Sequence, residues 1–266
     1  MSLLDVKNLT ISFDNTPVVQ DVSFSLEAGE RICLIGESGS GKSLTALAIT
    51  QLLPASAQVS GSIIFKGQEL LGLADKKMRK IRGKDIGLVF QEPQTALNPV
   101  IPLKHQLIAA KREHEHLARR DRLPAAIELA RQVKLPEPEQ IVHRYPHELS
   151  GGQRQRVVIA MAMSCQPALL IGDEPTTALD ATVQATILDL MMESTVQNNT
   201  SMLMITHDMA VAARTSDRLL VMRRGQILEQ GPTMQVLTTP HMSYTRELVA
   251  AARATSLNKA AWQVNQ

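Results

Sequence analysis

Hydrophobic and polar residues alternate along the first 26 positions of the chain. Polar residues mostly separate Leu4, Val6, Leu9, Ile11 and Phe13, and the stretch 18–26 repeats the pattern. A period of two places every second side chain on one face of a strand. The pattern therefore predicts two antiparallel strands, each buried on one face.

The character of the chain changes after this pair. A short apolar run at 31–35 predicts a buried strand, and a helical stretch from Lys42 to Leu53 stops before Pro54. The stretches 60–66 and 85–90 predict further strands. From Pro102 to Arg144 the sequence is charged, low in glycine and helical in pattern. We interpret this last region as a helical insertion.

Strands and helices alternate again beyond Leu149. Helices are predicted at 153–164 and 181–197, strands at 168–172 and 201–206, short strands at 219–222 and 226–230, and a last helix at 244–253. Such alternation favours a mainly parallel sheet covered on both faces. We predict an α/β core at 1–90 and 149–240, a helical subdomain at 91–148 that leads to residue 149, and a short helical tail at 241–266 that frays beyond Thr255.

Composition narrows the classes of protein. With 266 residues and 44% hydrophobic content, the chain suffices for one large domain or a domain with an insertion. The net charge of +2, without a basic strip, and the aromatic content of 3% argue against a nucleic-acid partner. Cys33 and Cys165 lack disulfide or metal-site spacing, which predicts a reduced, cytoplasmic compartment. Neither a membrane span nor a signal peptide is predicted.

One segment matches the phosphate-loop pattern G-x-x-x-x-G-K-[ST] in full. Its residues are Gly36, Glu37, Ser38, Gly39, Ser40, Gly41, Lys42 and Ser43, with Leu44 next. Backbone N–H groups of such a loop cradle phosphates, and the following helix adds the positive end of its dipole. Lys42 is expected to reach the β- and γ-phosphates of a nucleoside triphosphate, and the Ser43 hydroxyl to bind Mg²⁺.

A second glycine-rich turn precedes a helix. Residues 149–153 spell LSGGQ, in which Ser150, Gly151, Gly152 and Gln153 offer a hydroxyl and bare N–H groups at a helix start. This is a second potential anion site. Together with the phosphate loop, it makes the chain resemble the ATP-binding-cassette (ABC) ATPases. The resemblance implies an ABC-type P-loop NTPase with a RecA-like core, an antiparallel β subdomain and an inserted helical subdomain.

The resemblance also implies roles for single residues. Asp173, after the apolar strand, would bind Mg²⁺ and Glu174 would polarise the attacking water. Gln91 would contact Mg²⁺ and the water, and His207 would hydrogen-bond the γ-phosphate. Asp180 would be the last residue of the D-loop, 178–180, and Phe13 would stack on adenine.

Structural alternatives exist for several of these residues. Adjacent acids after a strand are often a helix cap with a first-turn charge. A lone histidine is more often structural than catalytic. Phe13 fits an ordinary strand residue about as well as an adenine contact.

The same resemblance implies partners. The anion that meets the 149–153 turn is supplied by a second ABC ATPase subunit, a copy or a homologue, docked head to tail around two ATP molecules. Segments 36–43, 91–99, 173–180 and 240–245 are similar to those of the peptide, nickel and opine importer branch, although Met242-Ser243 replaces a single proline. That branch implies membrane permease subunits, an extracytoplasmic solute-binding protein and a peripheral position on the cytoplasmic face of the bacterial cell membrane.

One other class of function stays open. ABC ATPases also act on nucleic acid or ribosomes, usually with long coiled coils or paired cassettes, and neither feature occurs in this sequence. A single short cassette favours transport. The sequence does not predict whether the cargo is a peptide, nickel, an opine or a metal chelate, because none of the motif residues would touch it.

Overall fold

The computed structural model describes residues 2–90, 93–176 and 180–255. These residues form two compact units, the first from the described parts of 1–73 and 203–266 and the second from 74–202. The residues of the predicted helical subdomain, 91–148, fall within the second unit, and the division of the chain into a core and a helical subdomain stays a prediction.

The first unit opens with an antiparallel sheet. Its strands lie in the order β2 (Thr16–Leu26), β1 (Leu4–Phe13), β4 (Gln58–Phe65) and β5 (Gln68–Glu69). Leu4 and Val6 are buried at alternate positions of β1, and so are Leu9 and Ile11. A register shift between Val6 and Leu9 brings both pairs to the buried face. The structure therefore confirms the two antiparallel strands predicted from the period of two, although β2 starts two residues earlier.

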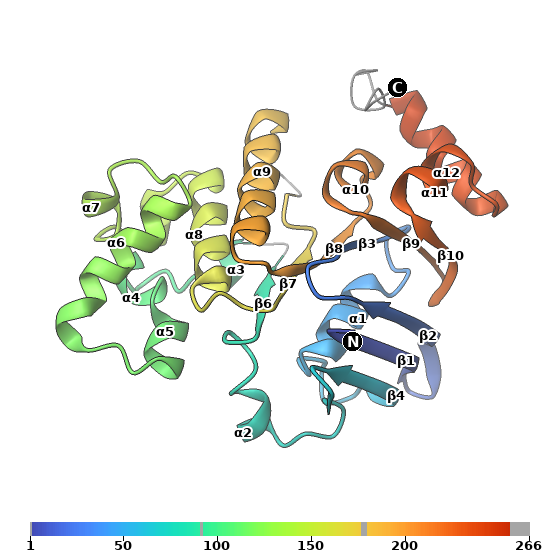
Figure 1. The fold of residues 1–266 in the computed structure, drawn as a ribbon, viewed down its shortest axis with the longest axis horizontal. Coiled ribbons are helices and arrows are strands. Elements are labelled where there is room, and N and C mark those ends of the chain that lie inside the picture. The colour runs from blue at the N-terminus through green and yellow to red at the C-terminus, as the bar shows by residue number, and fades with distance from the viewer. Residues whose placement is uncertain (1, 91–92, 177–179, 256–266) are drawn as a thin grey trace. The chain divides into compact units, whose positions relative to one another are not determined.

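A second group of strands in the first unit carries the predicted phosphate loop. The order is β10 (Gln226–Pro232), β9 (Arg218–Arg223), β3 (Arg31–Ile35) and β8 (Ser201–Thr206), of which β8 enters this unit at Leu203. β3 pairs with β9 in parallel and β9 with β10 antiparallel. Helices α10 (Met209–Thr215), α11 (Thr233–Thr238) and α12 (Ser243–Thr255) pack together beside these strands (Figure 1).

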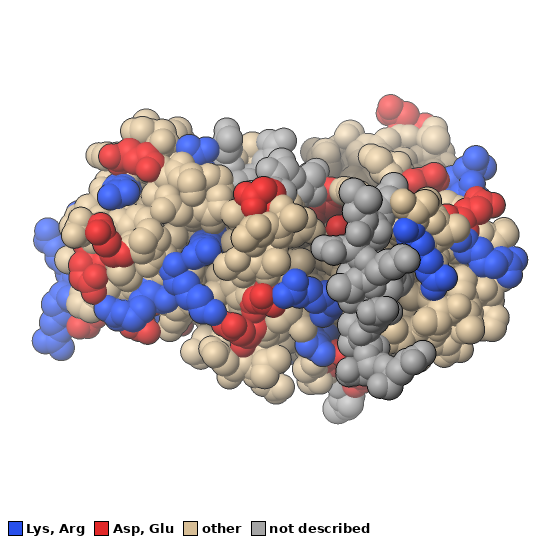
Figure 2. All heavy atoms as spheres, turned by 90° about the horizontal axis from the view of Figure 1, so that it is seen from above, with Lys and Arg blue, Asp and Glu red and all other residues tan. Residues whose placement is uncertain are grey.

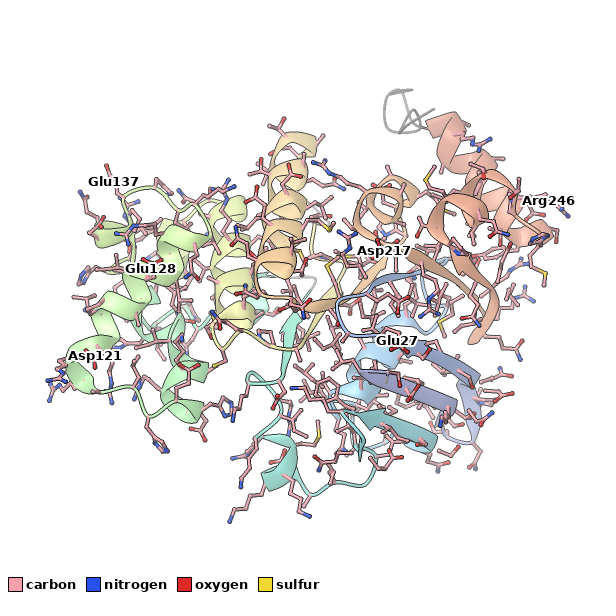
Figure 3. All side chains as sticks on the ribbon, in the orientation of Figure 1. Glu27, Asp121, Glu128, Glu137, Asp217 and Arg246 are labelled. Atoms are coloured by element: carbon pink, nitrogen blue, oxygen red, sulfur yellow. The ribbon has the colours of Figure 1, made fainter. Side chains whose placement is uncertain are left out.

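A charged pair joins the first residue of β3 to the residue that precedes β9. The Arg31 guanidinium donates hydrogen bonds to both carboxylate oxygens of Asp217, at 2.6 and 3.1 Å. Asp217, labelled in Figure 3, directly precedes β9. Burial by itself raises the pKa of the Asp217 carboxyl, but the bonds and charge of Arg31 outweigh it and leave the pKa below its usual value.

Helix α1 (Lys42–Ile49) is shorter than the sequence predicts, so the predicted end at Leu53 is wrong. Gln51 adopts a left-handed backbone with a φ of 50°, and the Leu52 N–H donates to the Leu47 carbonyl at 2.8 Å. This is a Schellman end, which glycine usually provides. Because Gln51 stands there instead, the sequence gives no sign of the stop, and the proline comes too late to set it.

The second unit holds the parallel pair β6 (Ile86–Val89) and β7 (Leu169–Asp173) among helices. Its helices are α2 (Asp75–Met78), α3 (Pro93–Ala96), α4 (Leu103–Gln106), α5 (Ala109–His114), α6 (Arg122–Gln132), α7 (Pro138–Ile141), α8 (Gly151–Met163) and α9 (Ala181–Gln197), with 3-10 turns η1 (Arg119–Asp121) and η2 (Pro146–Glu148). α8 and α9 lie side by side (Figure 1). On the face drawn in Figure 2, basic and acidic side chains are interspersed.

Candidate nucleotide-binding site

The phosphate-loop segment connects β3 to α1 within the first unit, as the sequence predicts. Its first glycine, Gly36, lies against β9, where a Cβ atom would come within 2.1 Å of the Met222 carbonyl oxygen. Its last glycine, Gly41, is the N-cap of α1 and has a φ of 105°. The first turn of α1 therefore starts at the loop, which places the positive end of the helix dipole there.

The Lys42 side chain lies inside the loop. Only 4% of Lys42 is exposed, and its Nζ donates to the carbonyl oxygens of Gly36 and Glu37, both at 2.9 Å. A buried ammonium needs strong acceptors, and a phosphate is a better one than a neutral carbonyl. Ser43 follows in the first helical turn and is half-buried. The loop therefore presents a pre-placed cation and a hydroxyl.

The hairpin between β9 and β10 supports the loop from behind. At its tip, the Gly225 N–H donates to the Ser40 carbonyl at 3.0 Å, and the Gly225 carbonyl accepts from the Gln20 N–H at 2.8 Å. The loop is thus hydrogen-bonded to the hairpin tip, which is in turn bonded to β2. These two hydrogen bonds join three segments that are far apart in the sequence.

His207 lies on the same side of the first unit as the start of the loop. It is exposed and directly follows β8, and the next residue, Asp208, caps α10 by accepting the Ala210 N–H at 2.7 Å. A pocket of about 490 Å³ has a wall composed of Ile35, Gly36, Glu37, His207, Asp208, Met209, Ala210, Leu248, Ala251 and Ala252. The structure thus brings His207 and the first loop residues to one pocket.

The acidic pair ends β7 in the second unit. Asp173 is the last residue of the strand, Glu174 follows, and both are half-buried. Glu174 has a φ of 46°, a left-handed backbone that is uncommon outside glycine and that concentrates at functional sites. The left-handed backbone at Glu174 turns the chain directly after Asp173, and the separate roles of the two carboxylates remain predictions.

The glycine-rich turn begins α8, two residues earlier than the predicted helix start. The Ser150 Oγ accepts the Gln153 N–H at 3.3 Å, and the Gln153 side chain accepts the Ser150 N–H at 3.0 Å. This capping box starts the helix at Gly151. Gly151 is exposed and Gly152 half-exposed, so the first-turn N–H groups lie at the surface of the unit.

The structure leaves the ligand roles of three predicted residues untested. Asp180 caps α9, because its carboxylate accepts the N–H groups of Thr182 and Val183 at 3.1 and 3.0 Å. Phe13 is the half-buried last residue of β1. Gln91, with the D-loop residues 178–179, lies outside the described residues. The ligand roles of all three remain predictions.

Two contributors escaped the sequence analysis. Asp208 caps α10. An aspartate directly before an apolar segment is a helix-start signal, so the sequence could have predicted this cap. Tyr244 lies on α12, and its hydroxyl accepts the Glu37 N–H at 3.2 Å. No local sequence pattern predicts this contact between Glu37 and Tyr244, because the two residues lie far apart along the chain.

Comparison with known proteins decides the family. The model of the family described as "ABC transporter" matches residues 19–177. The chain belongs to the ABC transporter family. This membership confirms the family that the motifs indicated.

Relatives with curated names support the same branch. The chain is 47% identical over 255 residues to the peptidoglycan transport ATP-binding protein YejF of Agrobacterium fabrum, covering 94% of this ABC chain and 47% of that protein. It is 44% identical to the oligopeptide transport ATP-binding protein OppD of Bacillus subtilis, covering 94% of this chain and 71% of OppD. The chain thus spans about half of one relative and most of the other.

Solved structures confirm the fold. A dimeric structure of MJ0796, a bacterial ABC transporter cassette, matches with a TM-score of 0.77 and 27% identity, over 86% of this chain and 98% of that one. The same cassette also matches in a dimeric post-hydrolysis state bound to ADP and Pi, at 26% identity. The α/β fold predicted for an ABC-type P-loop NTPase is therefore confirmed.

Proposed function

We propose that this chain is the ATP-hydrolysing subunit of an ABC importer that takes up peptides. The observation that carries the proposal is the phosphate loop built around the buried Lys42 ammonium, because this arrangement suits a nucleoside triphosphate. The peptide cargo is supported by the names of the relatives, which describe peptide, oligopeptide or glutathione transport.

The residues of the chain fit ATP and Mg²⁺. Backbone N–H groups at the α1 start and the Lys42 ammonium suit phosphate oxygens. The Ser43 hydroxyl and the Asp173 carboxylate are oxygen donors of the kind that Mg²⁺ prefers, and we propose Gln91 as a further ligand. When bound, Mg²⁺ would neutralise charge on the phosphates. Phe13 would contact the adenine.

Hydrolysis in this proposal depends on Glu174 and His207. The Glu174 carboxylate accepts a proton from the attacking water, and the His207 ring donates a hydrogen bond to the terminal phosphate. Ser150, Gly151 and Gly152 bind the nucleotide of a second ABC subunit, with Asp180 near the same seam. ATP then holds two subunits together, and its hydrolysis releases them.

Transport requires proteins other than this one. We propose that permease subunits in the bacterial cell membrane receive the closing motion and that a solute-binding protein delivers the peptide outside. Among the described residues, no helix combines the length and apolar character needed to cross a membrane. The chain would work as a peripheral subunit on the cytoplasmic face.

The test is a pair of variants of the full chain. Glu174→Gln should keep ATP affinity, lower turnover by about a hundredfold or more and accumulate as an ATP-bound dimer in gel filtration. Lys42→Ala should lose ATP affinity and stay monomeric in the same assay. Undiminished turnover in Glu174→Gln would remove Glu174 from the proposed chemistry.

The transport role has its own assay. Co-expression with the permease subunits of a peptide importer should recruit the chain to membrane vesicles, and a peptide substrate should stimulate ATP hydrolysis there. If nucleic acid stimulates the ATPase activity, and the chain binds vesicles equally with and without the permease, the transport role is refuted. Those results would favour an ABC ATPase that acts on nucleic acid or ribosomes.

A further inference from the structure

The C-terminal helix α12 is anchored to the first unit near both of its ends. The Glu229 carboxylate of β10 accepts the N–H groups of His241 and Met242, at 2.8 and 3.1 Å, just before the helix starts. Near the other end, Arg253 Nη2 donates to the Leu237 carbonyl at 3.1 Å. Thr245 is fully buried. The position of α12 on this unit is therefore fixed by several independent contacts.

This anchoring brings Tyr244 to the phosphate loop. Tyr244 is only 6% exposed, and its hydroxyl oxygen accepts the Glu37 N–H at 3.2 Å. Burial raises the pKa of the Tyr244 phenol, so the hydroxyl stays neutral at physiological pH. The contact spans 207 positions of the sequence, so it depends on the fold of the whole first unit.

Arg223 braces the same contact from β9. Its guanidinium carbon lies 4.3 Å from the centroid of the Tyr244 ring, within the range of a cation–π interaction. Its Nε is buried and lies 3.9 Å from a carboxylate oxygen of Glu37. Arg223 therefore contacts both partners of the hydrogen bond and limits their relative movement.

The Gly36–Glu37 peptide group is held on both sides. Its N–H group, that of Glu37, donates to the Tyr244 hydroxyl at 3.2 Å, and its carbonyl, that of Gly36, accepts from the Lys42 Nζ at 2.9 Å. An ammonium has three donors, so each donor that turns toward phosphate leaves one fewer for the loop carbonyls. Once Lys42 is engaged with a nucleotide, the Tyr244 bond gains importance as a restraint on this part of the loop.

We propose that Tyr244 is a positioning residue of the phosphate loop, through which the C-terminal segment 241–255 sets the affinity of the chain for nucleoside triphosphates. Without the hydroxyl, the Gly36–Glu37 peptide group samples other orientations. The fraction of loops competent to bind falls, and the apparent affinity falls with it. This inference rests on the proposed function, since it assumes that the loop binds ATP.

The test compares three variants of the full chain. Tyr244→Phe removes only the hydroxyl and keeps the ring under Arg223, whereas Tyr244→Ala removes both. Arg246→Ala is the matched control, because Arg246 is an exposed residue of the same helix and projects outward in Figure 3. ATP affinity is measured by calorimetry, ATP hydrolysis by steady-state kinetics, and exchange of the Glu37 amide by NMR.

We expect Tyr244→Phe to raise the Kd and KM for ATP about three- to tenfold, as the loss of one hydrogen bond allows, with kcat unchanged. The Glu37 amide should exchange faster, with or without ATP, while the melting temperature stays near that of Arg246→Ala. Normal ATP affinity and normal Glu37 exchange in Tyr244→Phe would overturn the inference. If the unaltered chain binds no ATP, the proposed function fails instead, and the exchange experiment still reports on the contact.

Discussion

Replacing Gly41 by alanine tests whether the phosphate loop is held by the strands behind it. Gly41 has a φ of 105°, and a Cβ atom there would lie 2.8 Å from Cγ2 of the buried Val19 and 3.3 Å from the Val18 carbonyl oxygen. Gly39 is a matched control in the same loop. Its φ is 78°, also left-handed, but nothing lies within 4 Å of its Cβ position.

The comparison of the two variants isolates the free-energy cost of overpacking the loop against β2. Alanine in a left-handed backbone costs about 1–2 kcal/mol, and both variants bear this cost. Only Gly41→Ala also overpacks the contact with β2, at about 1–3 kcal/mol, because Val19 is branched at Cβ and fully buried. The free energy of unfolding should therefore fall by about 1–3 kcal/mol more in Gly41→Ala than in Gly39→Ala.

Urea unfolding followed by circular dichroism measures this difference. In a Val19→Ala background the overlap with Cγ2 is removed, so the cost of Gly41→Ala should fall toward that of Gly39→Ala, while the contacts with Met222 Cε at 2.9 Å and the Val18 carbonyl at 3.3 Å remain. Recovery of folded Gly39→Ala but not folded Gly41→Ala would agree with the same reasoning. Equal destabilisation by the two substitutions in the unaltered background would refute it.

Further predictions concern charge and thiol chemistry. Because the folded-state pKa of Asp217 is lowered, the stability it adds is present above its usual pKa of about 3.9 and is lost as the pH falls through the lowered value. The gap in urea midpoint between the chain and Asp217→Asn should therefore shrink below about pH 4, and a gap independent of pH would contradict this. Burial raises the pKa of the Glu229 carboxyl, but the nearby Thr245 hydroxyl and the His241 and Met242 N–H groups outweigh it and lower the pKa. Acidification below about pH 4.3 should then lower the protection factors of the amides in the 241–245 segment, which NMR exchange rates at stepped pH, each divided by the intrinsic rate at that pH, would detect. Burial raises the pKa of the fully buried Cys33 thiol, so iodoacetamide should label the half-buried Cys165 first, as mass spectrometry of the native chain would show. Earlier labelling of Cys33 would contradict its burial.

Local signals predicted much of the fold. Helix α9 and strand β8 have the predicted bounds, Ala181–Gln197 and Ser201–Thr206, because the Asp180 cap and an apolar strand mark them clearly. The α1 stop was missed because a left-handed Gln51 replaced the expected glycine signal. The loop, its lysine and its place after a strand followed from the motif. The Tyr244 contact did not, since it depends on packing between segments 207 positions apart.

The tip of the β9–β10 hairpin has a practical consequence for labelling this protein. Short surface turns are the usual choice for inserting an epitope, a fluorophore site or a circular break. An insertion at Gly225 would break the hydrogen bonds of its N–H group with the Ser40 carbonyl and of its carbonyl with the Gln20 N–H. The phosphate loop would then lose its support from the hairpin. The turn at Gly67, where nothing lies within 4 Å of the Cβ position, is the safer place for a probe.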